Sequence, residues 1–130
     1  MGLFNFDQRK DLGRKGEDVA ARYLKRLGHR VLARNVVTPF GELDLVMQEK
    51  LSGRLVFVEV KARSREDVAA GEQAVGRAKQ RHVIRAAQAW LKSKGLSDAP
   101  VRFDVVAVAY ADAAGHGEPE LRHIPGAFLA

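Results

Sequence analysis

The sequence predicts an α/β protein with a mixed central sheet flanked by helices, and three observations lead to this class. Apolar residues recur with a helical period in two long segments, residues 8–27 and 72–94. They alternate, as in half-buried strands, in residues 41–48 and 56–63. Residues 101–110 are almost continuously apolar, which is typical of a strand covered on both faces. This order favours helices packed on a mixed sheet, and 130 residues suit one domain, residues 1–130.

The first predicted helix is amphipathic. Its apolar stripe holds Leu12, Val19, Tyr23 and Leu27. Gly28 follows directly, where a left-handed helix cap is expected. Residues 30–37 then suit a strand, and the segment TPFG makes a turn.

Two alternating strands, residues 41–48 and 56–63, are predicted to form an antiparallel hairpin. In the first strand, Leu43, Leu45 and Met47 are expected on one face, and Glu42, Asp44 and Val46 on the other. In the second strand, the sequence VFVEVKAR places Val56, Val58, Val60 and Ala62 on one face and Phe57, Glu59, Lys61 and Arg63 on the other. The charged face is either a solvated outer surface or the rim of a site.

The second predicted helix, residues 72–94, ends at Gly95 and buries one side. That side carries Val75, Val83, Ala86, Ala87, Trp90 and Leu91, so Trp90 is interpreted as a core residue. Residues 101–110 form a central strand, in which Asp104 either orients a neighbour or lies at the end of the sheet. A loop and a short last strand near residues 120–124 complete the chain.

Composition excludes several classes of site and location. The chain has no cysteine, which rules out disulfides, thiolate zinc sites and cysteine nucleophiles. No apolar run approaches the length that spans a bilayer, so no membrane partner is expected. The first ten residues lack the pattern of a signal peptide. A cytoplasmic location is the default expectation.

Charge points to a polyanionic partner. The formal net charge is +6, and the basic residues concentrate in two segments. Residues 1–35 hold nine Lys and Arg against four Asp and Glu, and residues 61–94 hold nine against three. Residues 36–60, between them, hold two against four. Carboxylates amid a basic surface are typical of a nuclease, which must hold metal ions close to phosphate, although solvated helix faces would give the same basic excess.

Asp44 and Glu59 are expected to lie side by side, since they occupy neighbouring strands of the predicted hairpin. Two like charges on one sheet face repel unless something binds between them. Mg²⁺ or Mn²⁺ is the simple candidate, because a hard cation prefers oxygen and commonly uses one or two carboxylates. Lys61 shares the face of Glu59 and could position an attacking water or offset charge on a phosphate.

The two segments that carry Asp44, Glu59 and Lys61 resemble those of a known family. The segments GELDLV and LVFVEVKAR are similar to the signature of the PD-(D/E)xK nucleases, although Leu43 replaces the signature's proline. From end to end, the chain is similar to the bacterial YraN family, which resembles archaeal Holliday-junction resolvases. The matching blocks are GRKGEDVAARYL, RN at residues 34–35, GELDL, VFVEVKAR, RFDVV and HIPGAF.

The resemblance implies a restriction-endonuclease-like core of order α-β-β-β-α-β and metal-dependent phosphodiester hydrolysis. It implies that Asp44, Glu59 and the Val60 carbonyl bind the metal and that Lys61 orients the water. Glu17 matches a further glutamate of the resolvase-like branch, as a weaker metal ligand and catalytic residue; a glutamate near a helix N-terminus also interacts well with the helix dipole. The basic residues expected to contact nucleic acid are Arg14, Lys15, Arg63, Lys79, Arg81 and Arg85.

The sequence therefore favours a magnesium-dependent endonuclease acting on DNA, including branched or otherwise structured DNA. The alternative is a protein of the same fold that binds nucleic acid within a DNA-processing assembly and does not cut. A homodimer is expected by resemblance alone, because junction resolvases act as dimers.

Overall fold

The computed structural model describes residues 2–69 and 75–130, with the backbone alone described for residues 2–10 and for residue 69. Three helices and five strands are present in these ranges. In chain order they are α1 (Gly2–Arg26), β1 (His29–Thr38), β2 (Gly41–Glu49), β3 (Leu55–Ser64), α2 (Arg65–Ala69), α3 (Arg77–Ser93), β4 (Val101–Tyr110) and β5 (Glu120–Phe128).

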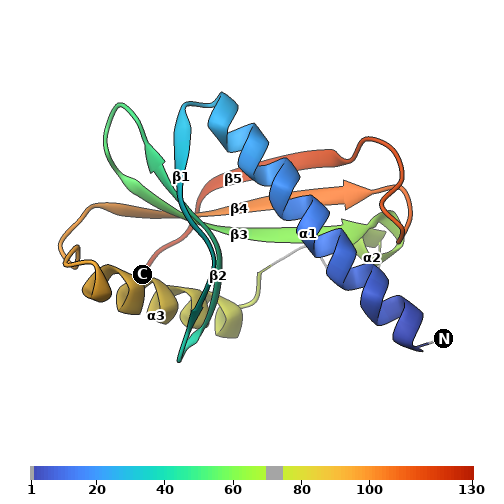
Figure 1. Cartoon of the computed structure of the whole chain (residues 1–130), viewed down its shortest axis with the longest axis horizontal. Coiled ribbons are helices and arrows are strands. Elements are labelled where there is room, and N and C mark those ends of the chain that lie inside the picture. Colours follow the sequence, from blue (N-terminus) through green and yellow to red (C-terminus); the bar gives the residue numbers. More distant parts are fainter. Residues whose placement is uncertain (1, 70–74) are drawn as a thin grey trace.

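The five strands form one mixed sheet, in the order β1-β2-β3-β4-β5. β3 and β4 are parallel, and every other neighbouring pair is antiparallel. The parallel pair requires a crossover, which α3 supplies between the two strands. Figure 1 shows the β1–β2 hairpin turning steeply away from the direction of β3, β4 and β5 while α1 crosses the sheet diagonally. The predicted mixed α/β architecture is confirmed.

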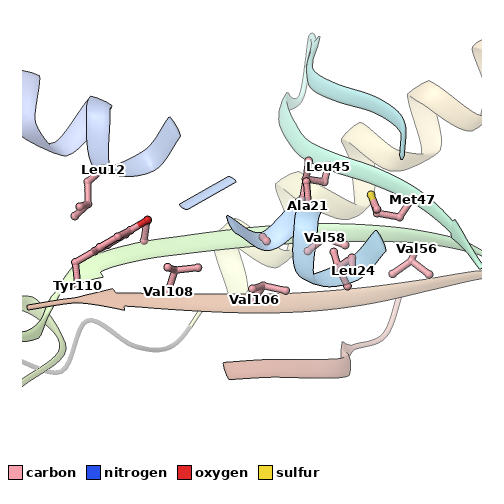
Figure 2. Close-up of a cluster of buried hydrophobic side chains, with 12 residues drawn as sticks. Leu12, Ala21, Leu24, Leu45, Met47, Val56, Val58, Val106, Val108 and Tyr110 are labelled. Carbon is pink, nitrogen blue, oxygen red and sulfur yellow. The ribbon is translucent and has the colours of Figure 1, made fainter. Parts of the chain in front are cut away.

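One face of the sheet packs against α1. Leu12, Ala21 and Leu24 from this helix meet buried side chains of β2, β3 and β4 (Figure 2). The closest approach is at Gly16, where the Cβ atom of any larger residue would lie 2.5 Å from the Cβ atom of Ala62 on β3. Glycine at this position therefore lets the helix lie directly on the strand.

The opposite face packs against α3 through an aromatic cluster. Phe57 on β3 contacts the edge of Trp90 on α3, with ring centroids 5.9 Å apart. Phe57 also stacks on Phe103, which stacks on Phe128 at the end of β5. Trp90 is buried, as predicted for a core residue. This layer fixes α3 against the half of the sheet nearest the start of β3.

Helix boundaries differ from the sequence prediction at both helices. α1 begins at Gly2, earlier than the predicted residue 8, and Leu27 is 51% exposed because it lies past the end of α1. Gly28 has φ +94°, as expected for a left-handed cap. α3 begins at Arg77, so the prediction that residues 75 and 76 are helical was wrong. Residues 72–74, which were also predicted to be helical, lie outside the described ranges.

Three further features were not predicted. The short helix α2 follows β3 directly, and β5 extends to Phe128 instead of ending near residue 124. Leu43 packs on the α3 side of the sheet, whereas Leu45 and Met47 pack on the α1 side, so the prediction of one shared face was wrong for Leu43. The cause is a change of face at Asp44, where β2 leaves its regular pairing with β3.

Asp104 lies in the middle of β4, not at the sheet end, and is completely buried. It accepts two hydrogen bonds from Arg102 and one from the Gly126 backbone N–H. Its carboxyl also forms a hydrogen bond with the His123 ring. Although burial alone would raise the pKa of Asp104, the hydrogen bonds from Arg102, Gly126 and His123 hold it below its ordinary value. The charged group therefore ties β5 to β4 where their pairing is irregular.

Among the residues that the structure describes, no helix is both long and apolar enough to cross a membrane.

Candidate functional site

The candidate site lies where β2 separates from β3. Regular pairing of the two strands runs from Gln48↔Leu55 to Leu45↔Val58 and includes no later pair. At the next position the Asp44 side chain accepts a hydrogen bond of 2.8 Å from the Val60 backbone N–H. A side-chain carboxylate thus takes the place of a main-chain partner, which holds Asp44 against β3.

Glu59 is the second member of the site. It is 8% exposed on β3, and its carboxyl lies beside that of Asp44, whose charge acts on it. Lys79, in the first turn of α3, places its Nζ atom 3.5 Å from Glu59 Oε1. Asp44 and Glu59, called the carboxylate pair below, therefore meet in a partly closed position with the ammonium group of Lys79 beside them.

Electrostatics disfavour full ionisation of the carboxylate pair. Burial has the largest effect on the pKa of Glu59, followed by the charge of Asp44. Together they raise this pKa to about 7, against the opposing effect of Lys79. Burial also raises the pKa of Asp44, which the Val60 N–H only partly offsets. Two carboxyls in contact with raised pKa values are typical of sites that bind a cation or transfer a proton.

Glu17 extends the negative charge from the side of α1. Burial, together with the charge of Asp44, raises the pKa of Glu17 to about 7. A hydrogen bond with Asn35 on β1 opposes the shift. Asn35 has φ +51°, a backbone conformation that asparagine tolerates better than most residues. The close contact of Gly16 with β3 brings the following residue, Glu17, toward the carboxylate pair.

Lys61 and Arg63 lie beside the carboxylate pair on a half-buried stretch of β3. A groove of about 340 Å³ runs along this stretch. Its lining residues are Glu59, Val60, Lys61, Arg63, Val75, Gly76 and Lys79. The side chains predicted to form the outer face of residues 56–63 therefore have two different environments. α3 covers Phe57, whereas Lys61 and Arg63 line an accessible groove.

The other predicted basic residues are spread over two helices. On α1, Arg14 is exposed, and Lys15 donates a hydrogen bond to the carbonyl of Ala114 in the β4–β5 loop. On α3, Arg81 is exposed and Arg85 lines a separate shallow groove with Phe40. Of the predicted nucleic-acid contacts, Lys79 and Arg63 are thus the two that border the carboxylate groove.

The carboxylate pair has the chemistry of a divalent cation site with few protein ligands. Among the residues whose side chains the structure describes, 11–68 and 75–130, no three His, Asp or Glu side chains are placed to hold one metal ion together. Two carboxylates suffice for Mg²⁺, which keeps several waters and takes further oxygen from substrate phosphate. The raised pKa values also fit, because a cation between the two groups would remove the cost of ionising both.

Sequence reasoning missed two contacts of the site. It assigned Lys79 to nucleic-acid binding alone and did not predict its ion pair with Glu59. It also gave no role to Asn35, which hydrogen-bonds Glu17. The dipeptide RN at residues 34–35 was a signal for Asn35, since asparagine in a strand is unusual.

Comparison with known proteins identifies the family. The sequence profile described as "Uncharacterised protein family UPF0102" matches residues 16–108. The chain belongs to the UPF0102 family. The resemblance to the YraN family is thereby confirmed, since YraN and UPF0102 denote the same group.

Curated UPF0102 proteins match over nearly the whole chain. A UPF0102 protein of Syntrophotalea carbinolica is 48% identical over 93% of this chain and 94% of its own length. One of Pelotomaculum thermopropionicum is 45% identical over 94% of this chain and 98% of its own length, and one of Anaeromyxobacter dehalogenans is 43% identical over 94% and 87%. The profile match includes Glu17, Asp44, Glu59, Lys61 and Lys79, whereas β5 lies beyond it.

Proposed function

We propose that this UPF0102 protein is a metal-dependent nuclease that hydrolyses phosphodiester bonds in DNA. The observation that carries the proposal is the carboxylate pair: Asp44 and Glu59 lie in contact, largely buried and with raised pKa values, at one end of a groove lined by lysine and arginine. Such a position would be unfavourable in a protein that only presented a basic surface to nucleic acid.

Asp44 and Glu59 would hold Mg²⁺ or Mn²⁺ through their side-chain oxygens. The Val60 backbone supports a third ligand, because the N–H and C=O of one strand residue point to the same neighbouring strand. Since the Val60 N–H meets Asp44, its carbonyl faces the gap that β2 leaves beside β3. The bound cation would supply charge stabilisation at the phosphate and lower the pKa of a water molecule.

Lys61 and Arg63 would act on the substrate from the same strand. In the proposed mechanism Lys61 orients the attacking water or offsets the negative charge that develops on phosphate oxygens. Arg63, which lies two residues beyond Lys61 on β3, would hold the phosphate backbone of the DNA. Lys79 lies 3.5 Å from Glu59 and offsets its charge, and it is close enough to contact a phosphate bound there.

The order of elements supports a restriction-endonuclease-like fold for this domain. One helix precedes three antiparallel strands, and a crossover helix then leads to a strand parallel to the third. The carboxylate pair and Lys61 occupy the second and third strands, as the PD-(D/E)xK signature requires. Fold alone does not determine activity, so the proposal depends on the site residues.

The test is incubation with single-stranded, duplex, flapped and four-way DNA in the presence of Mg²⁺ or Mn²⁺. Cleavage that chelator abolishes is expected, together with its loss in Asp44→Asn and Glu59→Gln. Calorimetry should show Mn²⁺ binding to the wild type and none to either variant, while DNA binding persists. Unchanged metal affinity in both variants would remove the proposed site.

Salt dependence separates the roles of the basic residues. Backbone contacts predict that DNA affinity falls steeply with salt and depends little on sequence, and that Arg63→Ala weakens binding. DNA binding without cleavage of any substrate in the panel would favour the alternative, a nucleic-acid-binding protein that does not cut. A flat response to salt would indicate a protein partner instead.

A further inference from the structure

A second groove continues from the carboxylate site across the sheet. Its volume is about 210 Å³, and it lies on the later parts of β3 and β4 and the first part of β5, beyond the aromatic residues that α3 covers. Its walls and floor include Lys61, Arg63, Ala107, Ala109, Arg122 and Ile124. Because Lys61 and Arg63 also line the groove beside Glu59, the two grooves adjoin along these side chains. We call this region the alanine groove.

Strand register explains the shape of the alanine groove. Lys61 on β3 pairs with Ala107 on β4, and Ala107 pairs with Arg122 on β5. Residues that pair across a sheet project from the same face, so two long cationic side chains flank one methyl group. In the next row toward the carboxylate pair, Glu59 pairs with Val105, which pairs with Ile124. Small residues on the central strand thus leave a trough between β3 and β5.

The alanine groove combines positive charge with an apolar floor. Lys61, Arg63 and Arg122 carry its positive charge, and Glu120 is the carboxylate that lines it. Glu120 forms an ion pair of 3.0 Å with Arg65 of α2, so its charge is compensated. Ile124 is 37% exposed and adds apolar surface to the floor formed by Ala107 and Ala109. This is the charge pattern of a site for an apolar ring attached to an anionic backbone.

We propose that the alanine groove binds one unpaired nucleotide of the DNA strand whose phosphate enters the carboxylate site. The inference rests on the proposed function and specifies its substrate class, which is DNA with an unpaired nucleotide next to the phosphate that is cut. A base inside a duplex is stacked and paired, so it cannot enter a recess in a protein surface. Arginine guanidinium groups stack on exposed bases, and Arg63 and Arg122 stand on opposite sides of the floor.

The dimensions favour a single nucleotide over a larger ligand. Pockets for drug-sized molecules usually span roughly 300–1,000 Å³, which is more than the alanine groove offers. The groove also adjoins the neighbouring groove along Lys61 and Arg63, so a nucleic-acid backbone that crosses these two side chains would reach both. A free mononucleotide would not need this adjacency.

The test measures binding in chelator, so that it does not depend on cleavage. Fluorescence anisotropy compares three labelled duplexes: one fully paired, one with a single unpaired nucleotide and one with an abasic residue at that position. The wild type is expected to bind the unpaired nucleotide about tenfold more tightly than the paired duplex, and the abasic duplex is expected to lose this preference. Equal affinity for all three would overturn the inference while leaving the nuclease proposal open to its own test.

Ala107→Leu fills the floor of the groove and is expected to abolish the preference while leaving affinity for paired duplex unchanged. Ala113→Leu, at an exposed position in the β4–β5 loop, is the matched control and should keep the preference. Arg122→Gln, on the exposed side of an edge strand, provides a second variant if Ala107→Leu does not fold, and should reduce the preference severalfold. Retention of the full preference in a folded Ala107→Leu protein, or in Arg122→Gln, would overturn the assignment of the groove.

Discussion

Glu59→Gln is expected to stabilise the metal-free protein at pH 8 and to leave its stability at pH 4 nearly unchanged. In the folded state, burial and the charge of Asp44 raise the pKa of Glu59 from 4.5 to about 7. The folded protein therefore holds this proton more tightly than the unfolded chain does. Stability is full below pH 4.5 and falls as the pH rises from 4.5 to 7, because the unfolded chain ionises first.

The size of the effect follows from the shift. One pKa unit corresponds to about 1.4 kcal/mol, so the shift from 4.5 to about 7 means that ionised Glu59 costs the folded protein at most about 3.5 kcal/mol above pH 7. Glutamine has nearly the same shape and carries no charge, which removes this cost. The pKa of about 7 already includes the opposing effect of Lys79, so the loss of this ion pair in Glu59→Gln does not lower the expected gain further.

The assay is urea denaturation at pH 4 and pH 8 in the presence of chelator. Asp98→Asn, at an exposed position, is the matched control and should change the free energy of unfolding by less than about 0.5 kcal/mol at either pH. Mn²⁺ should then stabilise the wild type at pH 8 and have no such effect on Glu59→Gln. A Glu59→Gln protein that is no more stable than the wild type at pH 8, or a gain independent of pH, would refute the electrostatic reasoning.

Three further substitutions test other parts of the molecule. Lys61→Ala should preserve folding, metal binding and DNA binding while cleavage falls by about 10²-fold or more, and a rate loss explained entirely by weaker binding would reduce Lys61 to a phosphate contact. Gly16→Ala should destabilise the protein by about 1–3 kcal/mol in urea denaturation, because the added carbon overlaps the Cβ atom of Ala62; a neutral result would mean that α1 moves freely away from β3. Asp104→Asn should lower the free energy of unfolding by about 3 kcal/mol, because it removes the negative charge that pairs with the partly buried guanidinium of Arg102. Asp18→Asn breaks an exposed ion pair and should lower the free energy of unfolding by less than about 1 kcal/mol. Similar losses in the two aspartate variants would contradict the difference in burial.

The sequence alone determined the order of the two long helices and the five strands and the proximity of the two carboxyls. Period-2 alternation in residues 56–63 correctly separated Val56 and Val58, which face α1, from Phe57, which faces α3. A hairpin leaves few possible registers, and the observed pairing Leu45↔Val58 brings Asp44 next to Glu59. These features depend on local periodicity and on a short connection, both of which can be read from a single chain.

Tertiary structure decided what surrounds the carboxylate pair and which surfaces continue from it. The face of Leu43 could not be predicted, because β2 breaks its regular pairing at Asp44 and the alternation shifts there. The ion pair of Lys79 with Glu59 depends on where α3 packs, which the aromatic contacts of Trp90 fix near the C-terminal end of the helix. Helical and strand periods specify which side of an element is buried, but not how two elements distant in sequence are placed against each other, because that placement is set by packing of the whole core.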